Sequence, residues 1–489
     1  MGFNLVVKLR VSVQIFSFDV PRTSSLSRPL FRASLRRVIG GLLVAVLLGF
    51  GVASTHAQSP SPTLDSLTVD RAVDQVLESY PAIEAARRDV EAAAARVGQA
   101  RSGYWPRVSA VASYRRQDPV PKVTVPGAPT GPGGESRSIG IQPNNLYDGH
   151  VEVRQTLYDF GKTGARIDQA EAGRMAAERR VEVERADLAF QVVRAFYTTL
   201  LAEARVDVQR DQLDQLKRTL AVVRRQQEGG IATEFEVQST QTRLSAARSR
   251  LTQFRSQRRN QAAELRRLLG TAPDDSLALR GSLRVSTGES SLRPDTLARK
   301  ALLQHPSVQA AQAQVRAAQR QVRVVDQSDA PTLALTAQGG VKNGYPGDLG
   351  EPRLNESVGV SLNVPLFEGF ATERQVEEAE AQVQAAEARL ADVRRQVGTR
   401  VEQAASDLRA QLDRLETTAL RVEQARRAAE LARTRYEAGT ITNLELLDAE
   451  TALQQARLER TEVRYQVVLG RYALKRAAGT LLPFQPASP

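Results

Sequence analysis

The sequence has 489 residues, of which 42% are hydrophobic and only 5% aromatic, and a composition rich in Ala, Arg, Glu, Leu and Gln favours long helices over a compact enzyme. It contains no cysteine, which excludes disulfides, thiolate metal sites and a lipidated N-terminal cysteine. The formal net charge of +12 falls to +6 when residues 1–57 are left out, and the remaining charges alternate in sign, which indicates solvated helix faces rather than a nucleic-acid surface.

The N-terminal region has the features of a secretory signal. Arg36-Arg37 precede an apolar stretch at 38–50, and Thr55-His56-Ala57 ends in a small residue suited to cleavage before Gln58. A membrane anchor is the alternative, but the apolar stretch is short and interrupted by glycines. Because no later segment approaches twenty apolar residues, we expect any membrane crossing in the mature protein to be made by β-strands.

A repeat organises the rest of the chain. Tyr80-Pro81 recurs 225 positions later as His305-Pro306, and further on the offset becomes 209, which relates Glu228 to Glu437. Because the offset stays constant over more than a hundred residues, neither copy has an insertion relative to the other in this region. Two long helices of equal length would require this. The predicted organisation is a signal peptide with an extended N-terminal region at 1–57, a first repeat at 58–283, a second repeat at 284–481 and a tail at 482–489.

Each unit begins with a helix, at about 67–101 and 295–327, which Tyr80-Pro81 or His305-Pro306 interrupts or delays. Segments with a period of two follow, at 107–116 and 151–157 in the first copy and at 332–338 and 357–364 in the second. Such alternation suits tilted strands of a membrane barrel, while a half-buried sheet is the alternative, and the signal sequence favours the barrel. A Pro/Gly-rich loop at 120–134 is absent from the second copy and accounts for the change of offset.

Long helices follow the strands. The segment 164–228 has no proline and, at 1.5 Å per residue, spans roughly 100 Å. In the second copy Leu446, Ala449, Leu453 and Ala456 repeat at 3-4 spacing, which predicts a coiled-coil seam. The two shorter helices of each unit, stacked end to end, are as long as the long helix. Side by side, they and the long helix can therefore form a wall of uniform length.

A tight turn precedes the last helix of each unit. Gly230 and Gly439 can supply a left-handed helix end. Thr233 with Glu236, and Thr442 with Glu445, fit the capping box that starts the returning helix. Each unit is therefore predicted to end in a helical hairpin whose tip lies far from the strands.

These features together resemble the TolC family of outer-membrane channel proteins. The matching segments are Leu157-Tyr158-Asp159-Phe160-Gly161, Pro365-Leu366-Phe367-Glu368-Gly369, Arg435-Tyr436-Glu437-Ala438-Gly439 and Leu444-Glu445-Leu446-Leu447-Asp448-Ala449-Glu450. The resemblance implies a mainly α fold with a small β part, in which the duplicated coiled-coil hairpins form an α-barrel. Four strands per subunit would contribute to a trimeric twelve-stranded transmembrane β-barrel.

The resemblance also implies a function and partners. It implies a homotrimer in the cell outer membrane, in contact with its lipid, that conducts substrates passively as the exit duct of a tripartite efflux pump or type I secretion system. A periplasmic adaptor and an inner-membrane pump of the RND or ABC type would be its partners. The implied protein is not an enzyme, holds no cofactor or metal and binds no nucleic acid; the cargo, the pump class and the resting state of the pore stay open.

The implied site residues lie at the hairpin tips. Alignment on the second turn places the family's periplasmic gate carboxylates at Glu445 and Asp448 and its gate tyrosine at Tyr436. Glu445 has the capping box as its alternative role, and Tyr436 has packing. A latch arginine of the family archetype aligns with Ile441, which puts that salt bridge in doubt. The tips implied to contact the adaptor are Gly230, Ile231, Ala232 and Thr233, and Gly439, Thr440, Ile441 and Thr442.

Two other classes of protein fit the sequence less well. An enzyme is disfavoured because His56 lies in the signal sequence, His150 borders a strand, His305 precedes a proline, and no phosphate loop or metal cluster is apparent. A periplasmic adaptor with a membrane-fusion role is also built from long hairpins. It should have one hairpin flanked by small β-domains, whereas this chain has two hairpins and two strand pairs.

Overall fold

The computed structural model describes residues 67–125, 137–272, 277–283 and 294–483, which belong to one compact unit. The predicted signal peptide, most of the Pro/Gly-rich loop and most of the tail lie outside these ranges, and the repeat boundaries stay a prediction. Within the described ranges, none of the helices combines the length and the apolar character that a membrane span requires.

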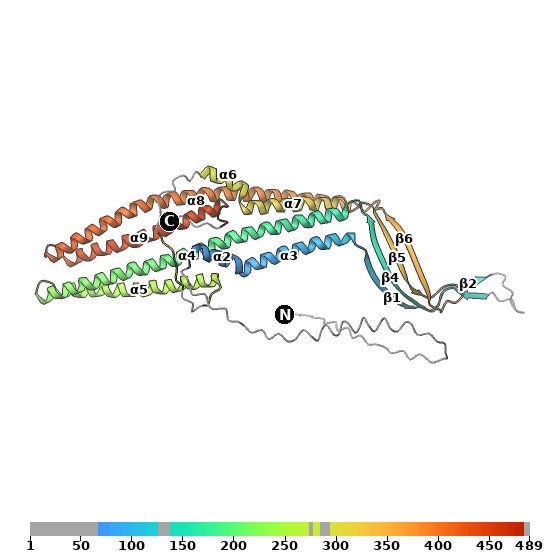
Figure 1. Cartoon of the computed structure of the whole chain (residues 1–489), viewed down its shortest axis with the longest axis horizontal. Coiled ribbons are helices and arrows are strands. Elements are labelled where there is room, and N and C mark those ends of the chain that lie inside the picture. The colour runs from blue at the N-terminus through green and yellow to red at the C-terminus, as the bar shows by residue number, and fades with distance from the viewer. Residues whose placement is uncertain (1–66, 126–136, 273–276, 284–293, 484–489) are drawn as a thin grey trace, which may run out of the picture. The chain divides into compact units, whose positions relative to one another are not determined.

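The two halves of the described chain contain corresponding elements (Figure 1). The first half contains α2 (Val69–Ser79), α3 (Pro81–Arg101), η1 (Ser102–Tyr104), β1 (Arg107–Arg116), β2 (Lys122–Val125), β3 (Arg137–Gly140), β4 (Asn145–Tyr158), α4 (Lys162–Glu228) and α5 (Glu234–Leu269). The second contains α6 (Pro294–Gln304), α7 (Pro306–Asp326), β5 (Thr332–Lys342), β6 (Arg353–Asn363), α8 (Ala371–Glu437) and α9 (Asn443–Ala477). The bounds of α2 and α3 recur at α6 and α7 with the offset of 225, and those of α4 recur at α8 with the offset of 209.

The predicted interruptions are confirmed. Tyr80 and His305 have extended backbones, with ψ angles of 131° and 129°, and each is followed by the proline that begins the next helix. A proline ring clashes with a helical residue before it, so the chain leaves the α conformation there and restarts one residue later.

The four long strands form one antiparallel sheet in the order β1-β4-β5-β6, so β1 and β6 are its edges. The register aligns Val108, Val153, Ala337 and Val358 in one row across the sheet. Directly paired residues share a face, so this row belongs to one apolar face. The face is open to the surroundings, since Val358 is 76% exposed.

The opposite face of the sheet is polar. The neighbouring row of the register aligns Ser109, Glu152, Gln338 and Ser357. The period-two pattern in the sequence therefore does separate an apolar face from a polar one, as predicted. Because these two rows keep their character across all four strands, this part of the sheet can separate an apolar medium from an aqueous one.

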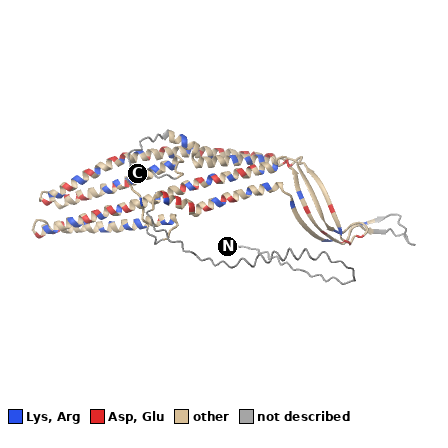
Figure 2. Ribbon diagram, viewed as in Figure 1, with Lys and Arg blue, Asp and Glu red and all other residues tan. Residues whose placement is uncertain are grey.

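Two helical hairpins extend from the sheet. Helices α4 and α8 each have 67 residues and span about 100 Å at 1.5 Å per residue. Each packs against its returning helix, α5 or α9, and the tips lie at the end of the long helices opposite the sheet (Figure 1). Figure 2 shows acidic and basic side chains interspersed along these helices, as the alternating signs in the sequence predicted.

The predicted turn chemistry is confirmed in both hairpins. Gly230 and Gly439 have φ angles of +74° and +72°, in the left-handed region that glycine adopts without a Cβ penalty. The capping boxes begin α5 at Thr233 and α9 at Thr442, each with its glutamate three residues later. Local sequence alone therefore fixes where both hairpins turn.

The buried face of α9 differs from the predicted apolar seam. Ala449 and Leu453 are only half-buried, whereas Glu450 and Gln454 are buried. The reason is that α9 packs against α4 of the other hairpin as well as against α8. A helix with two neighbours buries a wider stripe, which here includes polar side chains.

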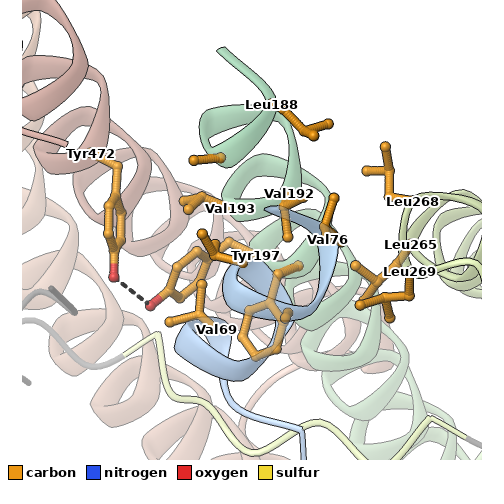
Figure 3. Close-up of a cluster of buried hydrophobic side chains, with 14 of the residues drawn as sticks. Val69, Val76, Leu188, Val192, Val193, Tyr197, Leu265, Leu268, Leu269 and Tyr472 are labelled. Atoms are coloured by element: carbon orange, nitrogen blue, oxygen red, sulfur yellow. Dashed lines mark hydrogen bonds between the residues drawn. The ribbon is translucent and has the colours of Figure 1, made fainter. Parts of the chain in front are cut away.

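The largest apolar cluster joins the two repeats where α2, α4, α5 and α9 meet (Figure 3). Phe196 and Val192 of α4 are fully buried there, and Leu265 of α5 packs with them. The hydroxyls of Tyr197 and Tyr472 lie 3.4 Å apart and form a hydrogen bond between α4 and α9. This cluster holds the C-terminal ends of α5 and α9 against α4, and the hairpin tips extend away from it.

Candidate functional site at the hairpin tips

The predicted tip residues lie at the ends of the hairpins, as Figure 1 shows for the two turns. Most of them are exposed, and the quasi-equivalent pair Ala232 and Ile441 is half-buried against the apolar cluster beneath. Three large apolar side chains, Ile231, Phe235 and Leu444, are exposed at or beside the turns. Exposed apolar groups at a helical tip suit contact with another protein.

Glu445 accepts hydrogen bonds from Thr442, the residue that caps the start of its own helix, α9. The N–H of Thr442 donates to its carboxylate at 2.8 Å and the Thr442 hydroxyl donates at 3.0 Å. These hydrogen bonds, the backbone one first, lower the pKa of Glu445 below its usual range. Glu236 makes the same pair of contacts with Thr233 in the first hairpin, at 2.7 and 3.1 Å. Glu445 therefore has the capping role that its position in the sequence predicted.

Asp448 makes a contact that the sequence did not predict. Its carboxylate accepts a hydrogen bond at 3.0 Å from the guanidinium of Arg243, which lies on α5 of the other hairpin. The same guanidinium donates to the hydroxyl of Thr451 at 3.2 Å and to the carbonyl of Leu447 at 3.4 Å. Arg243 thus clamps one turn of α9 onto the first hairpin.

The exposure of this ion pair is uneven. The Asp448 side chain is 64% exposed and that of Arg243 is 31% exposed. The carboxylate can therefore act on ions in solution while it remains tied to α5. One signal could have indicated Arg243: the second repeat has Ala452 at the equivalent position, so the arginine is specific to one copy.

Tyr436 is buried in the apolar cluster of the tips. It packs with Leu446 and Leu447 of its own hairpin and with residues of the first hairpin such as Leu220. Burial, followed by the nearby charge of Glu236, raises the pKa of Tyr436 to about 12. Its hydroxyl has no hydrogen-bond partner among the described residues. The packing role considered from the sequence is thus present, and the hydroxyl is held uncharged at neutral pH.

Ile441 is half-buried against the same cluster and its side chain carries no hydrogen-bond donor. It therefore cannot form the salt bridge that an arginine would form at this position. The cation contact that Arg243 makes from the opposite hairpin lies further along α9, at Asp448.

Within the described ranges, no three His, Asp, Glu or Cys residues stand close enough together to bind a metal ion. What the tips do present is an exposed carboxylate, a buried phenol and exposed apolar groups. Such a set can attract or repel ions and dock another helix.

Comparison with known proteins gives a consistent result. The sequence model of a family described as "Outer membrane efflux protein" matches residues 72–271 and 297–480, which is most of both repeats. The chain is 29% identical to Protein CyaE of Bordetella pertussis over 86% of each chain. It is 21% identical to the outer membrane protein TolC of Escherichia coli, over 90% of this chain and 86% of that protein.

The fold also matches solved structures. The outer-membrane channel OprN superimposes with a TM-score of 0.70 at 22% identity, over 84% of this chain and 90% of that one. At this identity the likeness concerns the fold alone. The mainly α fold with a small β part is therefore confirmed.

Proposed function

The chain belongs to the outer membrane efflux protein family, and we propose that its tips and its sheet form the two ends of a single conduit. The protein is a homotrimeric outer-membrane channel whose tunnel projects into the periplasm, and it is not an enzyme. It acts as the exit duct of an efflux pump or secretion system, together with a periplasmic adaptor and an inner-membrane pump. The alternative of a periplasmic adaptor is set aside because the family match includes both repeats.

One observation carries the proposal: a sheet with an exposed apolar face is joined directly to 67-residue helices. The apolar row that ends at Val358 faces lipid in this proposal, and the polar row with Glu152 faces the water-filled lumen. Three copies of the four-stranded sheet, joined β1 to β6, give a closed barrel of twelve strands. Closure satisfies the backbone groups of both edge strands, which would otherwise face lipid unpaired.

The helices close in the same way. Near the sheet they are adjacent in the order α3, α4, α7, α8, and near the tips in the order α5, α4, α9, α8. The free sides are thus α3 or α5 at one edge and α8 at the other. Exposed leucines of α8, Leu420 and Leu431, would be covered when α8 meets the next subunit. Near the sheet, the helices at the two free sides, α3 and α8, adjoin the two edge strands β1 and β6 along the chain. The sheet and the helical wall can therefore close at the same subunit boundary, as a closed tube requires.

We assign the gate to the second turn of each subunit. Asp448 is the charged group that lines the opening, Glu445 contributes a second carboxylate while it caps α9, and Tyr436 packs behind them. Carboxylates from three subunits that meet at an axis repel one another and attract cations, so they filter by charge. The tips at 230–233 and 439–442 dock the adaptor, with Ile231 as an exposed apolar contact.

Conductance of the purified trimer in a planar bilayer tests the proposal. We expect Asp448→Ala to raise the conductance and to reduce cation preference, because the charge and its tie to Arg243 are both lost. Asp207→Ala is the matched control, since Asp207 is 71% exposed and its ion pair in the described part of the chain is with Arg210 of its own helix. Unchanged current and unchanged ion preference would reject Asp448 as a gate residue. A mature chain that stays soluble and monomeric would reject the channel itself.

A further inference from the structure

A carboxylate occupies the buried stripe of α9. Glu450 follows Asn443, Leu446 and Leu447 at helical spacing, and its side chain is only 5% exposed. Glutamate is almost never buried to this extent unless its charge is paired. Its partners therefore show what the residue does.

Those partners come from both hairpins. The Glu450 carboxylate accepts hydrogen bonds from the amide of Gln215 at 2.7 Å and from the hydroxyl of Thr219 at 3.1 Å, both on α4. The guanidinium of Arg433, on α8, donates at 3.3 Å. Hydrogen bonds to a charged acceptor are roughly twice as strong as neutral ones. Glu450 thus joins three helices, two of one hairpin and one of the other.

The surroundings of this joint, by which we mean Glu450 and its partners Gln215, Thr219 and Arg433, are polar and open. A cavity of about 470 Å³ lies between α4, α8 and α9, and Glu450, Arg433 and Gln454 line it. Gln454 donates to the amide oxygen of Gln209 on α4 at 3.0 Å, whereas its own buried amide oxygen has no partner in the described part of the chain. A polar cavity of this size holds several waters. At this level exchangeable hydrogen bonds join the hairpins beside the apolar cluster that contains Leu216 and Leu447.

The joint is mechanically connected to the proposed gate. Asp448 lies two residues before Glu450 on the same helix, and no proline separates them. A rigid helix passes on rotation and displacement to its neighbouring positions. When α4 releases Glu450, the segment of α9 that bears Asp448 loses one buried polar attachment to the first hairpin. The hydrogen bond from Asn443 to the Thr240 hydroxyl, the apolar contacts of Leu446 and Leu447 and the exposed pair with Arg243 remain.

We propose that Glu450 is a positioning residue that holds the gate segment of α9 against the first hairpin and so favours the closed entrance. The inference rests on the proposed function, because it concerns the opening of the same tunnel. Water in the cavity can replace each partner as the hairpins part, so the joint opens and closes reversibly.

The test compares two glutamates of α9. Glu450→Ala removes the acceptor for α4, whereas Glu459→Ala removes an acid that pairs at 2.7 Å with Arg421 of its own hairpin. We expect Glu450→Ala to raise the open-to-closed ratio, measured on single trimers in a planar bilayer, roughly tenfold per subunit, the worth of one to two hydrogen bonds. Glu459→Ala should match the wild type. Thr219→Val removes a donor on α4 with little change in volume and should shift the ratio in the same direction.

A cross-link separates positioning from simple loss of stability. Because the chain has no cysteine, Gln209→Cys and Gln454→Cys can be joined by a thiol-reactive linker across the same seam. In the Glu450→Ala background this link should restore the closed state. If Glu450→Ala and Thr219→Val both match the wild type, or if the link leaves Glu450→Ala open, the inference is wrong. If the wild-type trimer itself does not conduct, the proposed function fails instead.

Discussion

Substitution of Arg243 measures how strongly the two hairpins are held together at the tips. In Arg243→Gln the ion pair with Asp448 is lost, together with the contacts to Thr451 and to the carbonyl of Leu447. The glutamine is too short to reach all three acceptors. We expect the tips of each subunit to separate more readily and the trimer to conduct more often.

The geometry sets the size of the effect. An exposed ion pair such as this one contributes about 0.2–1 kcal/mol. The bond to Thr451 adds about 1 kcal/mol, while the 3.4 Å contact to the Leu447 carbonyl is too long to add much. A total of about 1–2 kcal/mol per subunit corresponds to a change of roughly five- to thirtyfold in the opening equilibrium of one subunit. If the three subunits open together, the energies add and the change is roughly a hundredfold or more.

A double-mutant cycle in planar bilayers provides the measurement. Arg243→Gln and the double variant should open to similar extents, because both lack the ion pair and the contact to Thr451. Asp448→Asn keeps the contact to Thr451 and should open less than either of them. Arg250→Gln is the control, as an exposed arginine seven residues further along α5 that forms no salt bridge to any described residue. At 1 M salt the wild type should approach Arg243→Gln, since screening weakens exposed pairs. Strictly additive effects, or no dependence on salt, would refute the clamp.

Two further predictions concern stability. Phe196→Ala empties a fully buried position in the cluster that joins the repeats and should lower the free energy of unfolding by about 3–5 kcal/mol. The temperature at which the trimer dissociates on a gel should fall accordingly. An unchanged temperature would show that the cluster is not needed. Glu445 has a lowered folded-state pKa, so its cap contributes stability above the ordinary value of 4.5 and loses it as the pH falls through the lower folded value. Thermal unfolding followed by circular dichroism should therefore show Glu445→Gln less stable than the wild type near pH 7, with a difference that disappears in acid; a difference independent of pH would contradict the cap.

The sequence determined the local features of the fold because they depend on neighbouring residues. The prolines after Tyr80 and His305, the left-handed glycines and the capping boxes act within a few positions, and all appear where predicted. The sheet faces followed from a period of two. The position of Tyr436 at the second tip was also predicted, although the alignment could not distinguish a gating role from packing.

The contacts between the hairpins could not be predicted in the same way. Arg243 meets Asp448 across 205 positions of sequence, and Glu450 meets Gln215 across 235. Such pairs depend on how far one hairpin slides along the other, which no local pattern specifies. The 3-4 spacing in α9 correctly indicated Leu446 and Ala456 as buried, but it missed Glu450 and Gln454, because it could not reveal that α4 packs against α9 as well.

The comparison of the two copies nevertheless contains information about these contacts. Residues that shape each hairpin separately are shared, as Thr233 and Thr442 show. Residues that join the hairpins differ: Arg243 corresponds to Ala452, and Glu450 corresponds to Gln241. Contacts within a hairpin can be kept by both copies, whereas a contact between hairpins needs a donor on one and an acceptor on the other. Divergence between the repeats is therefore expected to be concentrated at the joint, and in this chain the joint lies beside the proposed gate.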